Sequence, residues 1–283
     1  MKIGILTFHS AQNYGAVLQA YALKHKLEMY NQNVEIIDYT NKEIEKIYKK
    51  KISKKNSLKY LKRPHVFWKN LRFDLNIKYA QPHWEEQWEK FNSFIETHLV
   101  EGKKIKDVHC INSYAKCFDI IIGGSDQVWC SDLTGGLDSI YVLDFLYSGL
   151  RVSYAASMNQ KELLEKEKNI IQFWLEKFDY ISVREEELAR SIKKLGYNVE
   201  TVVDPTLLLT ANDYIDIEEK RSEENYIFVY YVHEDSKMSE YAHNLAQKRN
   251  LKLYELHYYH WKHFDDSYQL SNLGPGEFLT MIK

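Results

Sequence analysis

The sequence predicts an α/β protein in which roughly the first two hundred residues form a doubly wound, parallel sheet. Short apolar runs alternate with longer segments that repeat apolar residues at helical spacing, which is typical of parallel strands connected by helices. Hydrophobic residues make up 45% of the 283 residues and charged residues 28%, the composition of a soluble globular protein. This length suggests one large or two ordinary domains.

The first strand–helix–strand unit lies at the N-terminus. Residues 2–8 form an apolar run typical of a buried strand, residues 13–15 a turn, residues 16–29 an amphipathic helix and residues 34–38 a second strand. We therefore expect a right-handed crossover and a parallel sheet.

The same alternation continues further along the chain. Strands are expected at 118–122, 152–156, 180–183 and 199–203, and helices at 161–178 and 185–195. Pro205 then restricts the residue before it and ends the last strand. We therefore expect an N-terminal domain over residues 1–204 and a second domain over residues 205–283.

The second domain has fewer recognisable elements. Strands are expected at 226–232 and 252–256, with a helix at 236–248 and the start of another at Pro275. Two strands with their helices bury little apolar surface for a segment of 79 residues. We expect that these residues hold only part of a second α/β domain. The alternative is a natural short form supported by the first domain or by another subunit.

A basic stretch interrupts the first domain, within an expected helical insertion at about 42–100. Residues 42–78 hold thirteen Lys and Arg residues against three acidic ones, interleaved with apolar residues that include Trp68. Such a stretch suits the surface of an anionic membrane. A solvated helical insertion explains the same pattern without any membrane.

The bulk composition excludes several classes of protein. A net charge of −2 and a pI near 6.6 argue against a dedicated nucleic-acid-binding protein. The cysteines, Cys110, Cys117 and Cys130, are odd in number and lack metal-site spacing, so we expect reduced thiols and a cytoplasmic protein. No metal is expected, because the spacing of His257, His260 and His263 drifts around a helix.

Polar residues follow the expected strand that ends near Ile122. Gly123 and Gly124 are followed by Ser125, Asp126, Gln127 and Trp129, so this strand delivers polar side chains to its carboxyl end. Glycines there let backbone amides approach an anion or a sugar. Asp126 suits a general base or an anchor for a sugar hydroxyl, although capping a turn is a competing role.

Two more strand ends carry polar residues that face the same edge of the sheet. The first strand is followed by a segment that also opens the first helix, and its candidates for binding are His9, Gln12, Asn13, Tyr14 and Gly15. Helix capping alone would also account for this segment. Arg184 follows the strand at 180–183 and suits an anionic substrate, or a salt bridge to a neighbouring glutamate.

Together these segments resemble the polysaccharide pyruvyl transferase family over nearly the whole chain. The resemblance rests on KIGILTFH and NYGAVLQAYA within 2–22, GSDQVW at 124–129, SYAAS at 153–157, ISVRE at 181–185, DPTLLL at 204–209 and GEFL at 276–279. Two positions depart from the family pattern: Cys130 stands where Asn is usual, and Met158 and Asn159 stand where an aromatic residue and Gly are usual.

The resemblance implies two Rossmann-like domains in a GT-B-like architecture. It implies transfer of a pyruvyl group from phosphoenolpyruvate to a sugar of a surface polysaccharide or its lipid-linked precursor, with formation of a ketal and without a further cofactor. Arg184 matches the donor-binding arginine of the family, and Asp126 is the other catalytic candidate. Family members continue into a Ser-Phe-His-Gly-like segment, whose histidine is the expected general acid and is not among these 283 residues.

Three hypotheses follow for the function. The first is a bacterial pyruvyl transferase at the cytoplasmic face of the membrane, which the basic stretch 42–78 could contact. The second keeps the fold but uses a nucleotide sugar, as GT-B glycosyltransferases do. The third is a truncated, non-catalytic protein that binds sugars or takes part in assembly.

Overall fold

The computed structural model describes residues 1–49, 84–158, 165–219, 225–233, 235–257, 268–270 and 272–283. Contacts divide the chain into two compact units. The first comprises Met1–Tyr48 and Phe94–Tyr214, and the second comprises Lys49–Ser93 and Ile215–Lys283. The first unit thus ends at Tyr214, and the expected insertion at about 42–100 is shared between the two. The division into functional domains remains a prediction.

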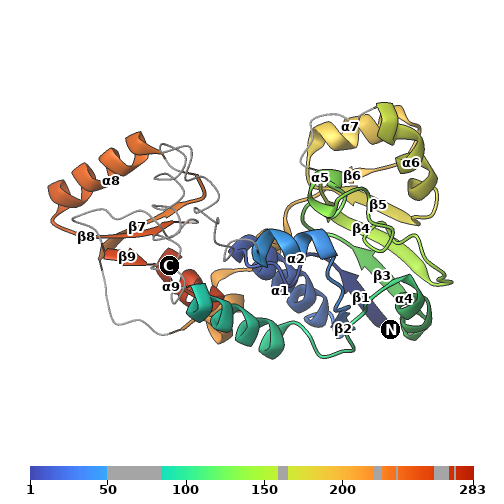
Figure 1. Ribbon diagram of the computed structural model, residues 1–283, viewed down its shortest axis with the longest axis horizontal. Helices are drawn as coiled ribbons and strands as arrows, with labels where there is room; N and C mark the ends of the chain where they lie inside the picture. Colours follow the sequence, from blue (N-terminus) through green and yellow to red (C-terminus); the bar gives the residue numbers. More distant parts are fainter. Residues whose placement is uncertain (50–83, 159–164, 220–224, 234, 258–267, 271) are drawn as a thin grey trace, which may run out of the picture. The chain divides into compact units, whose positions relative to one another are not determined.

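A parallel six-stranded sheet forms the centre of the first unit, and the predicted α/β class is confirmed (Figure 1). Its order is β2-β1-β3-β4-β5-β6, and every neighbouring pair is parallel. The strands are β1 (Lys2–Leu6), β2 (Asn33–Ile36), β3 (Ile120–Gly123), β4 (Leu150–Ala156), β5 (Tyr180–Val183) and β6 (Glu200–Thr201). The strand order reverses between β1 and β3, and ligands of open α/β sheets bind at the carboxyl ends beside such a reversal.

Helices follow most of these strands. In Figure 1, α6 and α7 lie on the same side of β4 and β5. The helices of this unit include α1 (Tyr14–Glu28), α2 (Lys42–Lys49), α4 (Val108–Tyr114), α5 (Ser131–Thr134), α6 (Glu165–Leu175) and α7 (Glu186–Lys194), with 3-10 turns η3 (Ala115–Cys117), η4 (Pro205–Leu208) and η5 (Ala211–Ile217), which runs into the second unit. A further helix covers residues 84–98.

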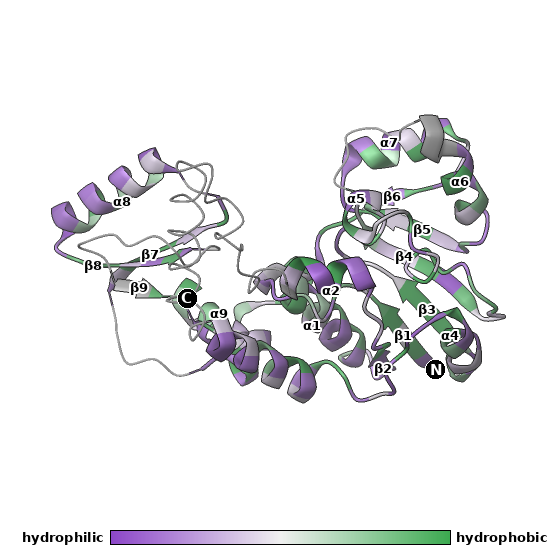
Figure 2. Ribbon diagram, viewed as in Figure 1, coloured by the Kyte–Doolittle hydropathy of each residue, from purple (hydrophilic) through white to green (hydrophobic). Residues whose placement is uncertain are grey.

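Apolar side chains on the central strands form the core of the first unit. Leu6 on β1 and Ile121 on β3 are fully buried and belong to one cluster of apolar residues. Figure 2 shows these two strands among the most hydrophobic parts of the sheet. Strands flanked on both sides are buried on both faces, which explains the continuous apolar runs in the sequence.

The first helix starts where its sequence provides a cap. Asn13 has an extended backbone, with φ of −143°, and its side chain accepts a hydrogen bond from the Ala16 amide. Asparagine in this position satisfies one of the free amides of the first turn. The helix therefore begins at Tyr14, two residues before the expected start, and its N-terminus lies directly after β1.

The second unit holds a parallel sheet of three strands, one more than predicted. These are β7 (Tyr226–Tyr231), β8 (Lys252–His257) and β9 (Tyr268–Leu270), in the order β7-β8-β9. Strand β9 was not predicted, because three residues give too short a pattern for a strand signal. Helices α8 (Ser236–Arg249) and α9 (Pro275–Ile282) complete the unit as predicted.

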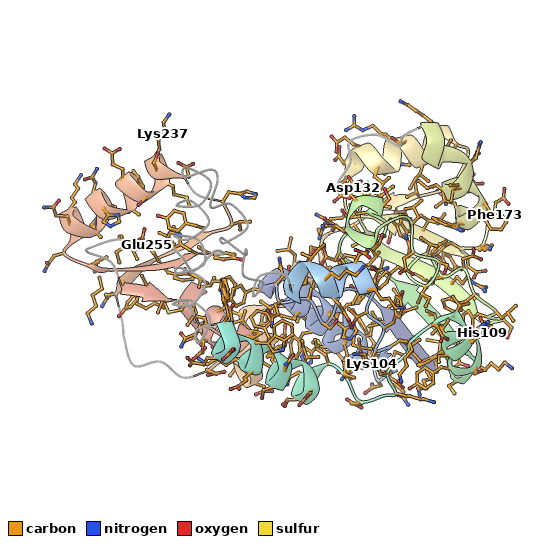
Figure 3. All side chains as sticks on the ribbon, viewed as in Figure 1. Lys104, His109, Asp132, Phe173, Lys237 and Glu255 are labelled. Atoms are coloured by element: carbon orange, nitrogen blue, oxygen red, sulfur yellow. The ribbon has the colours of Figure 1, made fainter. Side chains whose placement is uncertain are left out.

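The two faces of this second sheet pack against different helices. Leu253 belongs to a small cluster with Ala242 and Ala246 of α8, whereas Tyr230 packs edge-on against Phe278 of α9. On the α8 face, Glu255 is fully buried and accepts a hydrogen bond of 2.8 Å from the Tyr231 hydroxyl (Figure 3). The buried carboxylate thus has a protein partner, as such groups require.

Two sequence predictions concern residues that lie mostly outside the described parts. Most of the basic stretch 42–78 lies in this category, as do His260 and His263. Only the start of the basic stretch is described, and it forms α2. No helix in the described parts of the chain combines the length and hydrophobicity that a membrane span requires.

Candidate functional site

A cavity of about 320 Å³ lies at the carboxyl ends of four strands of the first unit. Its polar lining comes from the segments after β1, β3, β5 and β6, and includes Asn13, Asp126, Gln127, Arg184 and Asp204. This is the edge at which the sequence predicted polar residues to gather, and the reversal of strand order between β1 and β3 places the cavity there.

A larger hollow of about 470 Å³ lies over β4, β5 and β6. Its lining includes Tyr154, Asp179, Tyr180 and Tyr197, and none of the residues proposed from the sequence for catalysis or binding belongs to it. The convergence of polar groups from separate strand ends, rather than size, identifies the 320 Å³ cavity as the candidate site.

The segment after β3 is fixed by hydrogen bonds to its surroundings. Ser125 is buried, and its Oγ accepts a hydrogen bond of 2.7 Å from the Asp126 amide. The Ser125 carbonyl accepts a hydrogen bond of 2.8 Å from the Thr7 hydroxyl. The Gly124–Ser125 peptide bond is cis, and Asp126 has a φ of +72°. Aspartate tolerates this left-handed conformation better than most residues. The Asp126 side chain, which lines the cavity, accepts the Gln127 amide at 2.8 Å.

Arg184 is held between two carboxylates. Its Nη1 lies 2.7 Å from Oδ2 of Asp204, and its Nε lies 3.5 Å from Oε1 of Glu185. Asp204 in turn caps the turn η4, because its Oδ1 accepts both the amide and the hydroxyl of Thr206. Glu185 accepts the Ser157 hydroxyl at 2.6 Å. The guanidinium is therefore positioned by β4, β5 and the segment after β6.

The electrostatics of the cavity favour a protonated Asp126. Burial raises the pKa of the Asp126 carboxyl, and the nearby carboxylates Asp204 and Glu185 raise it further, against the lowering effects of the Gln127 amide and Arg184. Burial lowers the pKa of Arg184, but the hydrogen bond to Asp204 and the surrounding carboxylates outweigh this and raise it. Arg184 thus stays charged, while the Asp126 carboxyl holds a proton more readily than an ordinary aspartate does.

Apolar side chains cover another part of the cavity lining. Ile44, Ile47 and Tyr48 come from α2, and Leu133 comes from α5. The described start of the basic stretch therefore contributes to the candidate site, a role that its charge pattern did not predict. Mixed linings of this kind, apolar with a few placed polar groups, are usual for small-molecule sites.

Several residues proposed from the sequence lie away from the cavity. His9 is fully buried, with its ring nitrogens 3.2 Å from the Thr7 carbonyl and 3.2 Å from Asp38 Oδ1, and its hydrogen bond lowers the pKa of Asp38. Trp129 is 5% exposed and packs edge-on against Phe178 in the core. These two side chains contact other parts of the first unit and do not line the cavity.

Of the remaining proposed residues, some line the cavity and others are buried outside its lining. Tyr14 is buried in the first turn of α1, Gly15 and Asn13 line the cavity, and the Nε2 of Gln12 is buried without a hydrogen-bond partner among the described residues. Gly123 and Gly124 are buried as well. A Cβ on Gly124 would lie 2.5 Å from the Tyr154 carbonyl oxygen, so this glycine serves close packing against β4.

The structure adds three polar residues that the sequence analysis did not select. Asp204 and Thr206 line the cavity, as does Gln19, which is 1% exposed on α1. A signal for the first two was present, because DPT comes shortly after the last strand, as Arg184 comes after β5. Gln19 carried no signal of its own, since it sits inside a helix whose pattern predicts only burial.

A comparison with known families identifies the chain. The sequence model of the family described as polysaccharide pyruvyl transferase matches residues 13–283. The chain belongs to the polysaccharide pyruvyl transferase family. No curated protein and no solved structure matches the chain at a significant level.

Membership of this transferase family supports an enzymatic role and indicates polysaccharide pyruvyl transferase activity in general terms. The matched range includes Asp126, Gln127, Arg184 and Asp204, together with Asn13 at its start. The family therefore implies two kinds of ligand in general terms, a pyruvyl donor and a saccharide acceptor.

Proposed function

We propose that the protein transfers a pyruvyl group from phosphoenolpyruvate to a sugar of a surface polysaccharide, or of its lipid-linked precursor, and forms a cyclic ketal. The observation that carries this proposal is the convergence of Asp126, Arg184 and Asp204 on one cavity in a member of the pyruvyl transferase family. The reaction needs a cation for the donor and groups that move protons, and this cavity supplies both kinds.

Arg184 is assigned to the donor. It is the only Lys or Arg residue among the described residues that line the cavity. A guanidinium binds a carboxylate or a phosphate through two parallel hydrogen bonds. Asp204 occupies Nη1 of this group at 2.7 Å, and Nη2 forms no ion pair with the described residues, so the guanidinium can contact the donor while it stays paired with Asp204. The pre-existing ion pair keeps the guanidinium charged and oriented before the donor arrives.

Proton transfer in both directions is assigned to Asp126, including the general-acid step that the family resemblance assigned to a histidine. In its protonated form Asp126 gives a proton to the methylene carbon of phosphoenolpyruvate, which becomes a methyl group and leaves positive charge at the neighbouring carbon. A sugar hydroxyl adds to that carbon, and its proton returns to the Asp126 carboxylate. Phosphate then leaves, a second hydroxyl adds, and its proton goes to the departing phosphate. Burial of Asp126 supports this role, because it raises the pKa of the carboxyl.

We extend the proposal to the architecture and location of the enzyme. The parallel sheets of the two units are consistent with two Rossmann-like domains in a GT-B-like arrangement. A place at the cytoplasmic face of a bacterial membrane suits a lipid-linked acceptor, and the basic stretch 42–78 would contact anionic lipids.

A phosphate-release assay tests the proposed reaction. The full chain is mixed with phosphoenolpyruvate and a panel of lipid-linked and nitrophenyl hexosides, and acceptor-dependent phosphate is measured. We expect Arg184→Ala to lower the rate by about 10- to 100-fold, because a hydrogen bond to a charged group is lost. Arg190→Ala is the matched control, since Arg190 is an exposed residue of α7 that pairs with Glu186 and Glu187.

The outcomes separate the competing functions. No acceptor-dependent phosphate from the wild-type protein, or an equal rate in Arg184→Ala, contradicts pyruvyl transfer. Calorimetry with UDP, GDP and phosphoenolpyruvate addresses the glycosyltransferase alternative. That alternative requires UDP or GDP to bind to the protein and phosphoenolpyruvate not to bind. Binding of hexosides without any turnover would instead support a non-catalytic sugar-binding protein.

A further inference from the structure

Gln19, a residue of the cavity lining, carries an unused hydrogen-bond acceptor. The residue lies on the inner side of α1, is 1% exposed and belongs to the cavity lining. Its Nε2 donates to the Thr7 hydroxyl oxygen at 2.9 Å and to the Ala16 carbonyl at 2.8 Å. Its Oε1 is buried and has no hydrogen-bond partner among the described residues.

The surroundings fix which way the amide of Gln19 faces. The Ala16 carbonyl can only accept a hydrogen bond, so the nitrogen of the amide must face it. The Thr7 hydroxyl donates its own hydrogen to the Ser125 carbonyl at 2.8 Å and therefore accepts from Gln19. Both contacts would be lost if the amide were flipped, so Oε1 is the atom left without a donor.

A buried carbonyl oxygen without a donor is unfavourable, and such atoms are rare in folded proteins. None of the hydrogen bonds of the described residues reaches this oxygen. A ligand that enters the cavity with a hydrogen to donate would satisfy Oε1.

The two substrates of the proposed reaction differ in this respect. Phosphoenolpyruvate carries a carboxylate and a phosphate, which at neutral pH mainly accept hydrogen bonds. A saccharide carries hydroxyl groups, each of which can donate one. The unused acceptor therefore matches the saccharide and not the donor.

We propose that Gln19 is a specificity-determining residue, whose Oε1 accepts a hydrogen bond from one hydroxyl group of the saccharide acceptor. This inference rests on the proposed function for the identity of the ligand. The Thr7 hydroxyl acts as a positioning group, because it links Gln19 on α1 to Ser125, the neighbour of Asp126. The recognition group and the proton-transfer group are thus held by the same hydrogen-bond chain.

The test measures binding, so it does not depend on turnover. Saturation-transfer NMR is recorded for methyl hexopyranosides and their monodeoxy analogues with the full chain, its Gln19→Met variant and a Leu23→Met control. Leu23 is a buried residue of the same helix that does not line the cavity. Thr7→Val is the second test variant, to be used if Gln19→Met does not fold. It removes the hydroxyl that accepts a hydrogen bond from the Gln19 amide.

For the wild type, we expect removal of one particular hydroxyl to weaken binding roughly three- to tenfold, the effect of one neutral hydrogen bond. Gln19→Met should weaken the parent hexoside by a similar factor and lose the discrimination against that deoxy analogue. Affinity for phosphoenolpyruvate, measured by calorimetry, should stay within twofold, and Leu23→Met should resemble the wild type.

Three results would overturn the inference. They are unchanged discrimination in Gln19→Met, a loss of phosphoenolpyruvate affinity in place of hexoside affinity, and a wild-type protein that binds no hexoside. The phosphate-release assay reports separately on the proposed function. Hexoside binding that depends on Gln19, without phosphate release, would sustain this inference while the proposed reaction fails.

Discussion

At the scale of single residues, the candidate site is defined by one cation among carboxyl groups. Arg184 contacts Asp204 and Glu185, and its charge also acts on Asp126. Burial raises the pKa of the Asp126 carboxyl, which suits it to proton transfer. Asp204 accepts hydrogen bonds from Arg184 and Thr206, whereas the Asp126 carboxyl accepts the backbone amide of its neighbour Gln127.

The raised pKa of Asp126 predicts that this carboxyl lowers the free energy of unfolding at neutral pH. Between the usual value of 3.8 and the raised value, the folded state binds more protons than the unfolded state. Stability therefore falls as pH rises through that window. We expect Asp126→Asn to remove this loss, so that the melting temperature of the variant, relative to the wild type, increases between pH 4 and pH 8.

The control for this experiment is Asp132→Asn. Asp132 is an exposed residue at the start of α5 (Figure 3). Thermal unfolding of the three proteins is followed by circular dichroism at each pH. A difference between Asp126→Asn and the wild type that stays constant or becomes more negative toward pH 8 would contradict the assigned role of burial.

At the scale of elements, strand ends explain how much could be predicted. Because parallel strands share one carboxyl edge, the positions of Asn13, Asp126 and Arg184 after their strands were sufficient to predict their convergence. Asp204 follows β6 in the same way, but its neighbour Pro205 made the segment look like a simple boundary. The sequence showed the break in the strand, not the ion pair beyond it.

Side-chain direction could not be predicted in the same manner. The GSDQVW segment was expected to deliver Trp129 to the cleft, yet Trp129 packs into the core while Asp126 and Gln127 line the cavity. Outside regular strands there is no fixed alternation of faces, so the conformation at each residue decides. Here the φ of +72° at Asp126 is part of that conformation, and no periodic pattern signals it.

The tight contact between the β3 end and β4 gives a prediction for Gly124. Gly124 has a φ of +108°, and a Cβ would meet the Tyr154 carbonyl oxygen at 2.5 Å. We expect Gly124→Ala to lower the free energy of unfolding by about 2–5 kcal/mol, from backbone strain together with overpacking. Denaturant unfolding measures this change.

Gly136 is the matched control for that substitution. It has a similar φ of +118°, but a Cβ there would meet nothing within 4 Å. Gly136→Ala should therefore cost only the conformational part, about 1–2 kcal/mol. Equal costs at the two positions would show that packing against β4 does not constrain Gly124.

At the scale of the whole molecule, each compact unit has its own sheet and its own apolar cluster. The large cluster of the first unit includes Ile121, and the small cluster of the second includes Leu253. The two sheets share no strand, since the first contains β1 to β6 and the second β7 to β9. Units with separate cores can open separately, because most contacts that stabilise each of them lie within it.

Hydrogen exchange detected by mass spectrometry tests whether the units open separately. Leu253→Ala and Ile121→Ala both remove most of a buried apolar side chain, at a cost of about 2–5 kcal/mol each. We expect Leu253→Ala to accelerate exchange in peptides from β7 and β8 by at least about 30-fold, with little change in β1 and β3. Ile121→Ala should show the reverse pattern. Equal acceleration in all four strands for both variants would mean that the chain unfolds as one cooperative unit, in which case a substitution in one sheet weakens the cavity at the edge of the other.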